Sequence, residues 1–232
     1  MSWLTEFESV ALALSLKVAL VSVVACLPAG LLAAWVLARH AFPGKVLLDG
    51  LLHLPLVLPP VVVGYALLLL LGRRGPLGGW LYDTLGISVA FTWEGAAVAA
   101  AVMAFPLTVR AMRLSLEAVD RRLEAAARTL GASPLRVFVT ITLPLMGPGI
   151  LAGAILTFAR ALGEFGATIT FVSNIPGETQ TLPLALYTLV QTPDGEGGAL
   201  RLAVIAILVA LAALVASEWL ARRIGRPTEA GR

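Results

Sequence analysis

Arg160 and Glu164 are the two ionisable residues in this sequence whose position most invites a chemical explanation. They stand four residues apart within an apolar stretch, so on an α-helix they share one face. Charged groups at membrane depth are costly, and they usually pair with each other or face a water-filled cavity. Two interpretations stay open: a structural ion pair that holds helices together, or part of a pathway or gate for a charged solute.

Two threonines and two prolines are further candidates for a solute pathway, the threonines as hydrogen-bond donors and the prolines as residues that break a helix. Thr168 and Thr170 carry neutral donors, which suit transient anion binding and equally suit hydrogen bonding between helices. Pro59 and Pro60 remove backbone donors and predict a kink or break, which either lines a cavity or only bends the helix. The candidate pathway or gate residues are thus Pro59, Pro60, Arg160, Glu164, Thr168 and Thr170.

Enzyme signatures are missing from the sequence. No Gly-x4-Gly-Lys-Ser/Thr phosphate loop is found, so the chain does not use ATP by that route. His40 and His53 are the only histidines, and neither has metal-ligand spacing. We therefore expect no catalytic residues, no metal site and no cofactor bound by this chain.

The composition indicates a membrane protein. Hydrophobic residues make up 59% of the 232 residues and charged residues 13%, whereas soluble domains have about 25% charged residues. A helix needs about 20 apolar residues to span a bilayer, where lipid offers the backbone no hydrogen-bond partners. We predict an all-α, polytopic membrane domain over residues 10–220, in contact with lipid. A short helix at 182–190 is not expected to span the membrane. Five spans are expected: Val10–Leu37, Leu47–Leu71, Thr92–Met112, Met146–Ile169 and Leu200–Leu220.

Basic residues near the span ends predict the orientation, because cytoplasmic loops carry an excess of Lys and Arg. The membrane therefore also explains most of the positive charge, without a nucleic-acid partner. This places the N-terminus outside and the C-terminus, with a tail over residues 221–232, in the cytoplasm. Twelve of the 17 basic residues lie on the side assigned to the cytoplasm: Arg39, Lys45, Arg110, Arg113, Arg121, Arg122, Arg128, Arg136, Arg222, Arg223, Arg226 and Arg232.

The longest predicted cytoplasmic loop covers residues 117–144 and contains two short helices. Residues 124–130 are strongly helix-forming, and Gly131 after them is free to adopt a positive φ. Ser133 is a good N-cap, and Pro134 suits the first position of a second helix over 134–139. The loop is thus predicted to be two helices joined at a glycine elbow.

This loop resembles the EAA motif of ABC-importer permeases. The family pattern is Glu-Ala-Ala, three residues, Gly, nine residues and Ile-x-Leu-Pro, and Gly131 and residues 141–144 match its spacing. The position of the family glutamate is occupied by Ala125, and Glu124 stands one residue earlier, a rotation of about 100° on a helix. We therefore transfer no family role to Glu124.

The resemblance implies a type I ABC importer permease fold whose loop docks into a separate ATPase subunit, where ATP is used. The residues implied in this coupling are Ala125, Ala126, Gly131, Ala132, Ser133 and Pro134. The arginines that flank them either pair with acidic groups of the ATPase or only follow the positive-inside rule.

Three segments are similar to the molybdate branch of these permeases: residues 53–65, 127–144 and 159–183. The similarity implies a bacterial cytoplasmic-membrane permease that takes molybdate from an external or periplasmic binding protein and works with two copies of an ATPase. A homodimer is expected, because five helices barely enclose a pathway. A sulfate or tungstate permease is the alternative within the class, and a membrane-embedded enzyme or stand-alone channel is the alternative outside it.

Overall fold

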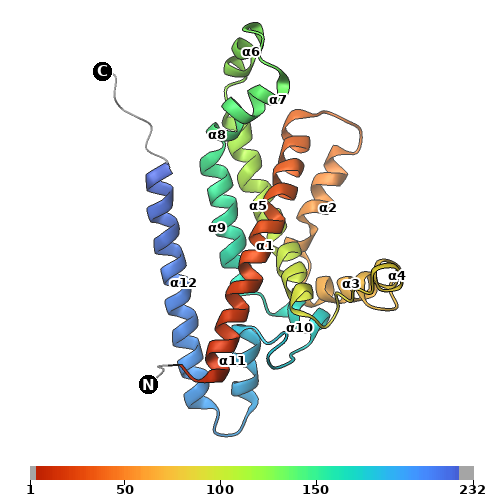
Figure 1. Cartoon of the computed structure of the whole chain (residues 1–232), viewed down its shortest axis with the longest axis vertical. Coiled ribbons are helices and arrows are strands. Elements are labelled where there is room, and N and C mark those ends of the chain that lie inside the picture. The colour runs from red at the N-terminus through yellow and green to blue at the C-terminus, as the bar shows by residue number, and fades with distance from the viewer. Residues whose placement is uncertain (1–3, 225–232) are drawn as a thin grey trace.

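The computed structural model describes the backbone of residues 4–224, and the side chains of residues 4–216 and of Trp219. Every regular element in that range is helical, as predicted (Figure 1). In chain order the elements are α1 (Glu6–Arg39), α2 (Lys45–Val57), α3 (Pro60–Leu71), α4 (Pro76–Leu85), α5 (Trp93–Ala118), α6 (Arg121–Thr129), α7 (Pro134–Val137), the π-helix η1 (Phe138–Thr142), α8 (Leu143–Leu145), α9 (Gly147–Leu162), α10 (Gly166–Val172), α11 (Leu182–Gln191) and α12 (Glu196–Ile224).

The long helices begin at residues that satisfy their free N–H groups. α1 opens with a capping box, in which Thr5 Oγ1 accepts the N–H of Glu8 and a Glu8 carboxylate oxygen accepts the N–H of Thr5. At the start of α5, Thr92 Oγ1 accepts the N–H of Gly95 at 3.2 Å. The apolar runs therefore become helices with defined starting points.

Three helices of the described chain are long and apolar enough to cross a bilayer: α1, α5 and α12. The number rises to five if each of two bent pairs counts as one span. One pair is α2 with α3, bent by 116° at Leu58–Pro59, where the sequence predicted a break. The other joins residues 134–145 to α9 with a bend of 64°.

The predicted fourth span, Met146–Ile169, is wrong as a continuous helix. α9 ends at Leu162, and the chain resumes as the separate short helix α10 at Gly166. The interruption falls at the Gly-Glu-Phe-Gly run, residues 163–166. Its two glycines, Gly163 and Gly166, favour a break because glycine is a poor helix former. The short helix predicted at 182–190 is confirmed as α11. The predicted tail, residues 221–232, falls outside the described residues except for the backbone of α12 up to Ile224.

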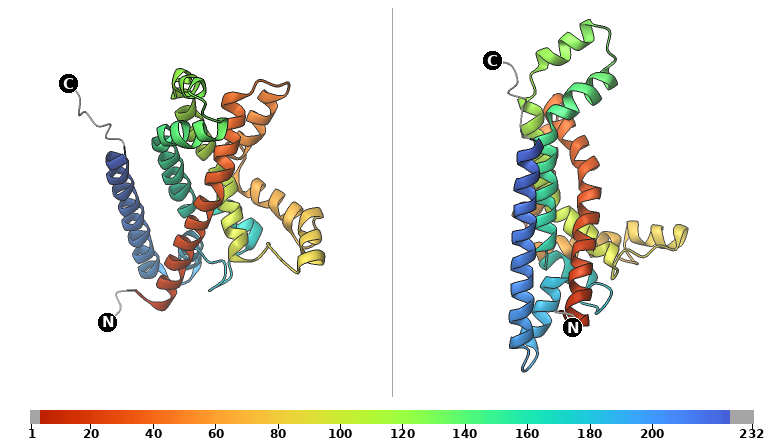
Figure 2. Two further views of the ribbon diagram at one scale, coloured as in Figure 1. Left: turned by 45° about the horizontal axis from the view of Figure 1, so that its top comes forward. Right: turned by 60° about the vertical axis from the view of Figure 1, so that its left-hand side comes forward.

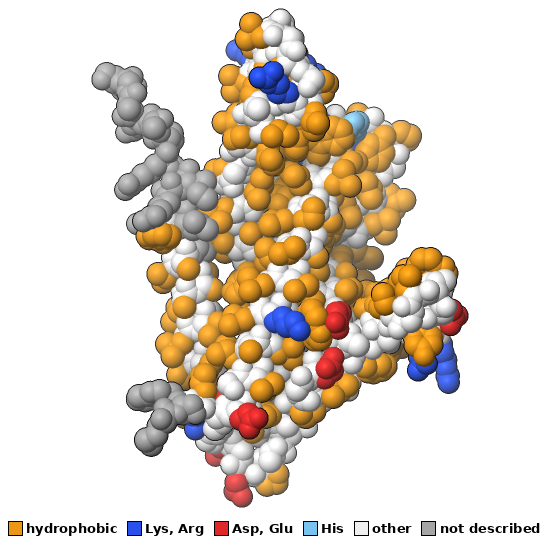
Figure 3. All heavy atoms as spheres, viewed as in Figure 1, with side chains coloured by type: hydrophobic (Ala, Val, Ile, Leu, Met, Phe, Trp, Pro, Cys, Tyr) orange, Lys and Arg blue, Asp and Glu red, His pale blue; other side chains and the backbone are white. Residues whose placement is uncertain are grey.

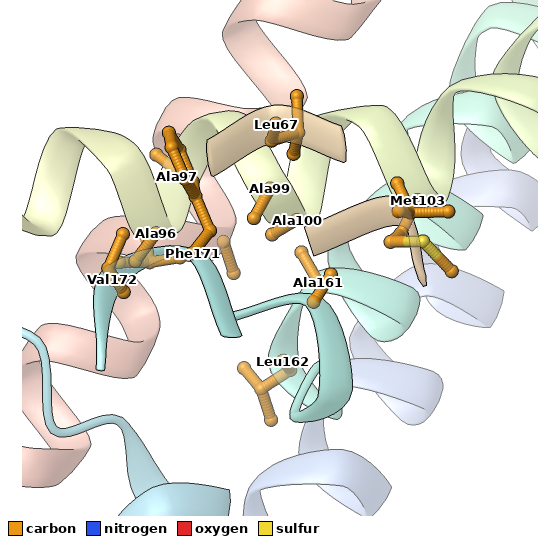
Figure 4. Packing of buried hydrophobic residues seen from close by; sticks show 14 of the residues in the cluster. Leu67, Ala96, Ala97, Ala99, Ala100, Met103, Ala161, Leu162, Phe171 and Val172 are labelled. Carbon is orange, nitrogen blue, oxygen red and sulfur yellow. The ribbon is translucent and has the colours of Figure 1, made fainter. Parts of the chain in front are cut away.

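Small residues let α1, α5 and α9 approach closely, as is usual for helices in membranes. A Cβ on Gly30 of α1 would lie 2.8 Å from Thr108 Cγ2 of α5. Two turns further along α5, Gly149 of α9 packs against Ser115. Toward the α10 end, alanines of α5 pack with Leu67, Ala161 and Phe171 in the largest buried apolar cluster (Figure 4).

The molecule has two distinct ends. The helix pair α6–α7 stands at one end, toward which α12 also runs, whereas the start of α1 and α11 lie at the other (Figure 1). The hairpin α3–α4 projects sideways, and α12 lies on the outside against α9 and α11 (Figure 2). Hydrophobic side chains cover most of the face between the two ends (Figure 3).

Candidate functional site

The elbow at one end of the molecule has the predicted conformation. α6 is capped by Asp120, whose Oδ1 accepts the N–H of Arg122 at 2.8 Å. Gly131 follows with φ +86°, a conformation that other residues rarely adopt. A Cβ at Gly131 would meet no atom within 4 Å, so the glycine is needed for its backbone angle and not for space.

The second helix begins as predicted but ends early. Ser133 Oγ accepts the N–H of Arg136 at 3.4 Å, and Pro134 takes the first position of α7. The α-helix stops at Val137 instead of residue 139, because η1 takes over with wider turns. The N–H of Leu143 donates to the Phe138 carbonyl five residues back, directly before Pro144, which has no N–H to continue an α-helical ladder.

The six residues predicted for coupling form the outer surface of this elbow. Ala132 is half-buried, and the other five are exposed: Ala125, Ala126, Gly131, Ser133 and Pro134. Small side chains over two short helices give a narrow surface that a cleft in another protein can surround. The structure thus brings the predicted coupling residues together and leaves them uncovered.

Glu124 has contacts that the sequence did not reveal. Its Oε1 lies 2.6 Å from Arg39 Nη2 at the end of α1, and it also accepts a hydrogen bond of 2.7 Å from Thr142 Oγ1 in η1. The side chains of Glu124 and Arg39 are each only 13% exposed. Charge-assisted bonds of this length are the strong class of hydrogen bond in proteins. The two ionic partners are 85 positions apart, so no local pattern links them.

A cavity of about 1000 Å³ separates the C-terminal part of α1, from Pro28 to Arg39, from α6 and α7. Its wall on the α1 side is apolar and includes Leu31, Leu32 and Trp35. Arg39 and Glu124 lie in its lining, so their ion pair bridges the two sides of the cavity.

A second candidate region lies where two helix breaks meet. α3 starts at Pro60 after the first break, and α10 starts at Gly166 after the second. A Cβ on Gly166 would lie 2.8 Å from Pro60 Cβ. One turn further along, a Cβ on Gly64 would lie 2.5 Å from the Ala167 carbonyl oxygen and 2.9 Å from Thr170 Cβ. Pro60 and Gly166, the last residue of the Gly-Glu-Phe-Gly run, are therefore direct neighbours.

Arg160 and Glu164 form an ion pair of 2.5 Å across the end of α9. Glu164 is buried, and its Oε1 also accepts the N–H of Ala167 at 2.9 Å in the first turn of α10. The carboxylate therefore connects the two sides of the α9–α10 break. Arg160 is 28% exposed, so the buried member of the pair is the acid.

The threonines of the candidate pathway belong to α10. Thr168 is buried, and Thr170 Oγ1 donates to the Gly166 carbonyl at 2.8 Å, within its own helix. Of the six candidate pathway residues, the structure groups Pro60, Glu164 and Thr170 around one contact between α3 and α10. Pro59 caps the start of α3, and Arg160 adjoins the group through its ion pair.

Comparison with known proteins gives a family match over most of the chain. The model of the family described as "Binding-protein-dependent transport system inner membrane component" matches residues 27–226. The chain is 64% identical to the molybdenum transport system permease protein ModB of Escherichia coli strain K12, over 94% of this chain and 96% of that protein. It is 40% identical to the sulfate transport system permease protein CysW of Synechocystis, over 95% of this chain and 79% of that protein.

Solved transporters share the fold at low identity. A bacterial alginate ABC transporter, solved with an alginate pentasaccharide-bound periplasmic protein, matches with a TM-score of 0.76 at 17% identity, over 96% of this chain and 81% of that one. The MetNI methionine ABC transporter, in inward-facing conformations, matches with a TM-score of 0.69 at 16% identity, over 95% of both chains. The arrangement of helices is therefore that of ABC-importer permeases.

Proposed function

Because this chain belongs to the family of binding-protein-dependent transport system inner membrane components, we propose that it is the permease subunit through which an ABC importer moves molybdate. The chain is a transport component and not an enzyme. The 64% identity to a molybdenum permease over nearly the whole chain supports molybdate as the solute. The prediction that the transported solute is an oxyanion rests on this identity and on the resemblance of residues 159–183 to molybdate permeases.

The exposed elbow at Gly131 is the observation that carries the proposal. It places Ala125, Ala126 and Pro134, all exposed, at one end of the molecule. In this proposal each elbow docks into one of two ATPase subunits, which bind and hydrolyse ATP, while this chain binds no cofactor. ATP-driven closure of the ATPases then moves the helices as rigid bodies and alternates access to the pathway.

The end that carries the elbow faces the cytoplasm in this proposal. Arg39, Lys45 and the arginines of α6 all lie there, as the positive-inside rule requires. The N-terminus and α11 then face outward, where an external molybdate-binding protein delivers the anion. The location is the bacterial inner membrane.

A homodimer completes the pathway. Broken helices near the membrane centre are typical of transport sites, and in this chain the α2–α3 and α9–α10 breaks touch. The hairpin α3–α4 projects from the bundle and exposes Leu69, Leu77 and Trp80. A second copy that covers this hairpin would enclose the pathway between the two chains, with lipid around the remaining apolar surface.

Sulfate is the second candidate solute, favoured by the 40% identity to a sulfate permease. Tungstate is a third, because it has the same charge and nearly the same geometry as molybdate. The test is to co-purify the chain with its ATPase and to measure ATP hydrolysis with the cognate binding protein loaded with each anion. We expect molybdate to stimulate hydrolysis and sulfate to leave it at the basal rate. Stimulation by sulfate alone would overturn the assignment of the solute.

A further inference from the structure

The structure assigns Glu124 a positioning role: with Arg39 and Thr142 it forms a brace that fixes the elbow to the inner ends of α1 and of the η1–α9 segment. The brace is defined as these three residues. It deepens the proposed function, because it concerns how movement of the docked elbow reaches the membrane helices. The inference rests on that function, and the experiment below separates the two.

The geometry ties three elements at one carboxylate oxygen. Arg39 is in the last turn of α1, Glu124 in the first turn of α6, and Thr142 is the last residue of η1. Glu124 Oε1 receives both the guanidinium of Arg39 at 2.6 Å and the hydroxyl of Thr142 at 2.7 Å. Thr142 itself is buried. This oxygen therefore links α6 to α1 and adds a polar contact to the packing of α6 on η1.

The surroundings make the brace the main connection between α6 and the span α1. α6 packs chiefly on α7 and η1, and the cavity separates it from α1. Among the described residues, the other polar contact across this gap is Arg121 Nη2 to the Ala38 carbonyl, at the long distance of 3.5 Å. A force applied to the elbow thus reaches α1 through Arg39, and it reaches α9 along the continuous chain α7–η1–α8, to which Thr142 attaches Glu124.

The one-residue displacement of Glu124 from the motif position places its carboxylate against Arg39. Adjacent helical residues differ by about 100° in direction. At position 124 the carboxylate pairs with Arg39, and at position 125 an exposed alanine lines the cavity beside that pair. The acid of the motif is used in this chain for an internal contact, and the exposed surface of the elbow carries alanines together with Leu130 and Leu135.

The test uses the complex of the chain with its ATPase, in lipid nanodiscs, with the molybdate-loaded binding protein as the stimulating ligand. Glu124→Gln keeps the size of the side chain and removes its charge. We expect the complex to assemble and to keep its basal ATP hydrolysis, and the stimulation by loaded binding protein to fall roughly tenfold, the size expected for loss of one charge-assisted hydrogen bond.

Glu8→Gln is the matched control. Glu8 is a buried acid, Glu124 a largely buried one, and Glu8 likewise pairs with an arginine from another helix, Arg201 at 2.9 Å. Glu8 lies at the opposite end of the molecule. The same chemical change there should lower the melting temperature by a similar amount and leave the stimulation intact. Equal losses of stimulation in both variants would show a general effect of lost ion pairs and would overturn the brace.

A double-mutant cycle supplies the second readout. Arg39→Gln and Glu124→Gln remove the same contact, so the double variant should lose no more stimulation than either single variant. Additive losses would overturn the inference, as would wild-type stimulation in Glu124→Gln. If the wild-type complex shows no stimulation by any loaded binding protein, the proposed function fails, and not only the brace.

Discussion

Gly166 packs directly on Pro60, so the α2–α3 and α9–α10 breaks of this chain lie against each other. A methyl group on Gly166 would stand 2.8 Å from Pro60 Cβ, closer than real side chains approach. The contact continues along α3 and α10 at Gly64, which faces Ala167 and Thr170. The sequence separates these segments by about a hundred residues, and the fold joins them at one point inside the bundle.

Gly64→Ala is predicted to destabilise the contact between α3 and α10. Its Cβ would lie 2.5 Å from the Ala167 carbonyl oxygen, which is backbone and cannot rotate away. Overpacking of this kind costs about 1–3 kcal/mol. Thermal unfolding in detergent should show a clearly lower melting temperature for the variant.

Gly50→Ala is the control for that experiment. Gly50 lies inside α2, and a Cβ there would meet nothing within 4 Å. Alanine is favoured over glycine in a helix by about 1 kcal/mol, so this variant should be as stable as the wild type or more so. Equal melting temperatures for the two variants would contradict the close α3–α10 contact.

Gly131→Val is predicted to uncouple transport without preventing membrane insertion. The positive φ of Gly131 is costly for a β-branched residue, and strain of this kind costs about 1–3 kcal/mol. The elbow should rearrange, and stimulation of the ATPase by loaded binding protein should be lost. Gly131→Asn tests the cause, since asparagine tolerates this conformation and should retain most of the stimulation. Loss of stimulation in both variants alike would show that the backbone angle is not the reason.

Arg160→Met is predicted to be strongly destabilising, because it leaves the buried carboxylate of Glu164 without its ionic partner. Breaking a buried pair from one side costs about 3–5 kcal/mol. The double variant Arg160→Met/Glu164→Gln should recover most of the loss, because the amide oxygen can still accept the N–H of Ala167. Melting temperatures of the single and double variants measure this directly, and a stable Arg160→Met protein would refute the structural role of the pair.

Transport by the double variant then separates the two interpretations of the pair. If Arg160 and Glu164 act only to join α9 to α10, the stable double variant should transport at the wild-type rate. A stable but inactive double variant would place the charges in the pathway or gate.

Local patterns were sufficient for much of the fold. Apolar runs located the long helices, Pro59 and Pro60 located the first break, and Gly131 with Ser133 located the elbow, because each acts on its own stretch of backbone. The second break was missed, since the apolar run through Gly163 and Gly166 continues without a proline.

Contacts between distant residues were beyond such patterns. Glu124 meets Arg39 only after the chain has crossed the bundle, and its displacement within the motif gave no hint of where it points. Likewise, no periodicity predicts that Gly64 faces Ala167. The six candidate pathway residues therefore stay a prediction from the sequence, while their spatial arrangement depended on the structure.

The measurement that tests the central claim most directly is ATP-driven uptake of labelled molybdate into proteoliposomes that contain the chain and its ATPase. The account predicts accumulation that requires ATP on the elbow side and loaded binding protein on the opposite side, and that stops with Gly131→Val. Uptake by the chain alone, without the ATPase and ATP, would contradict the account and show a channel.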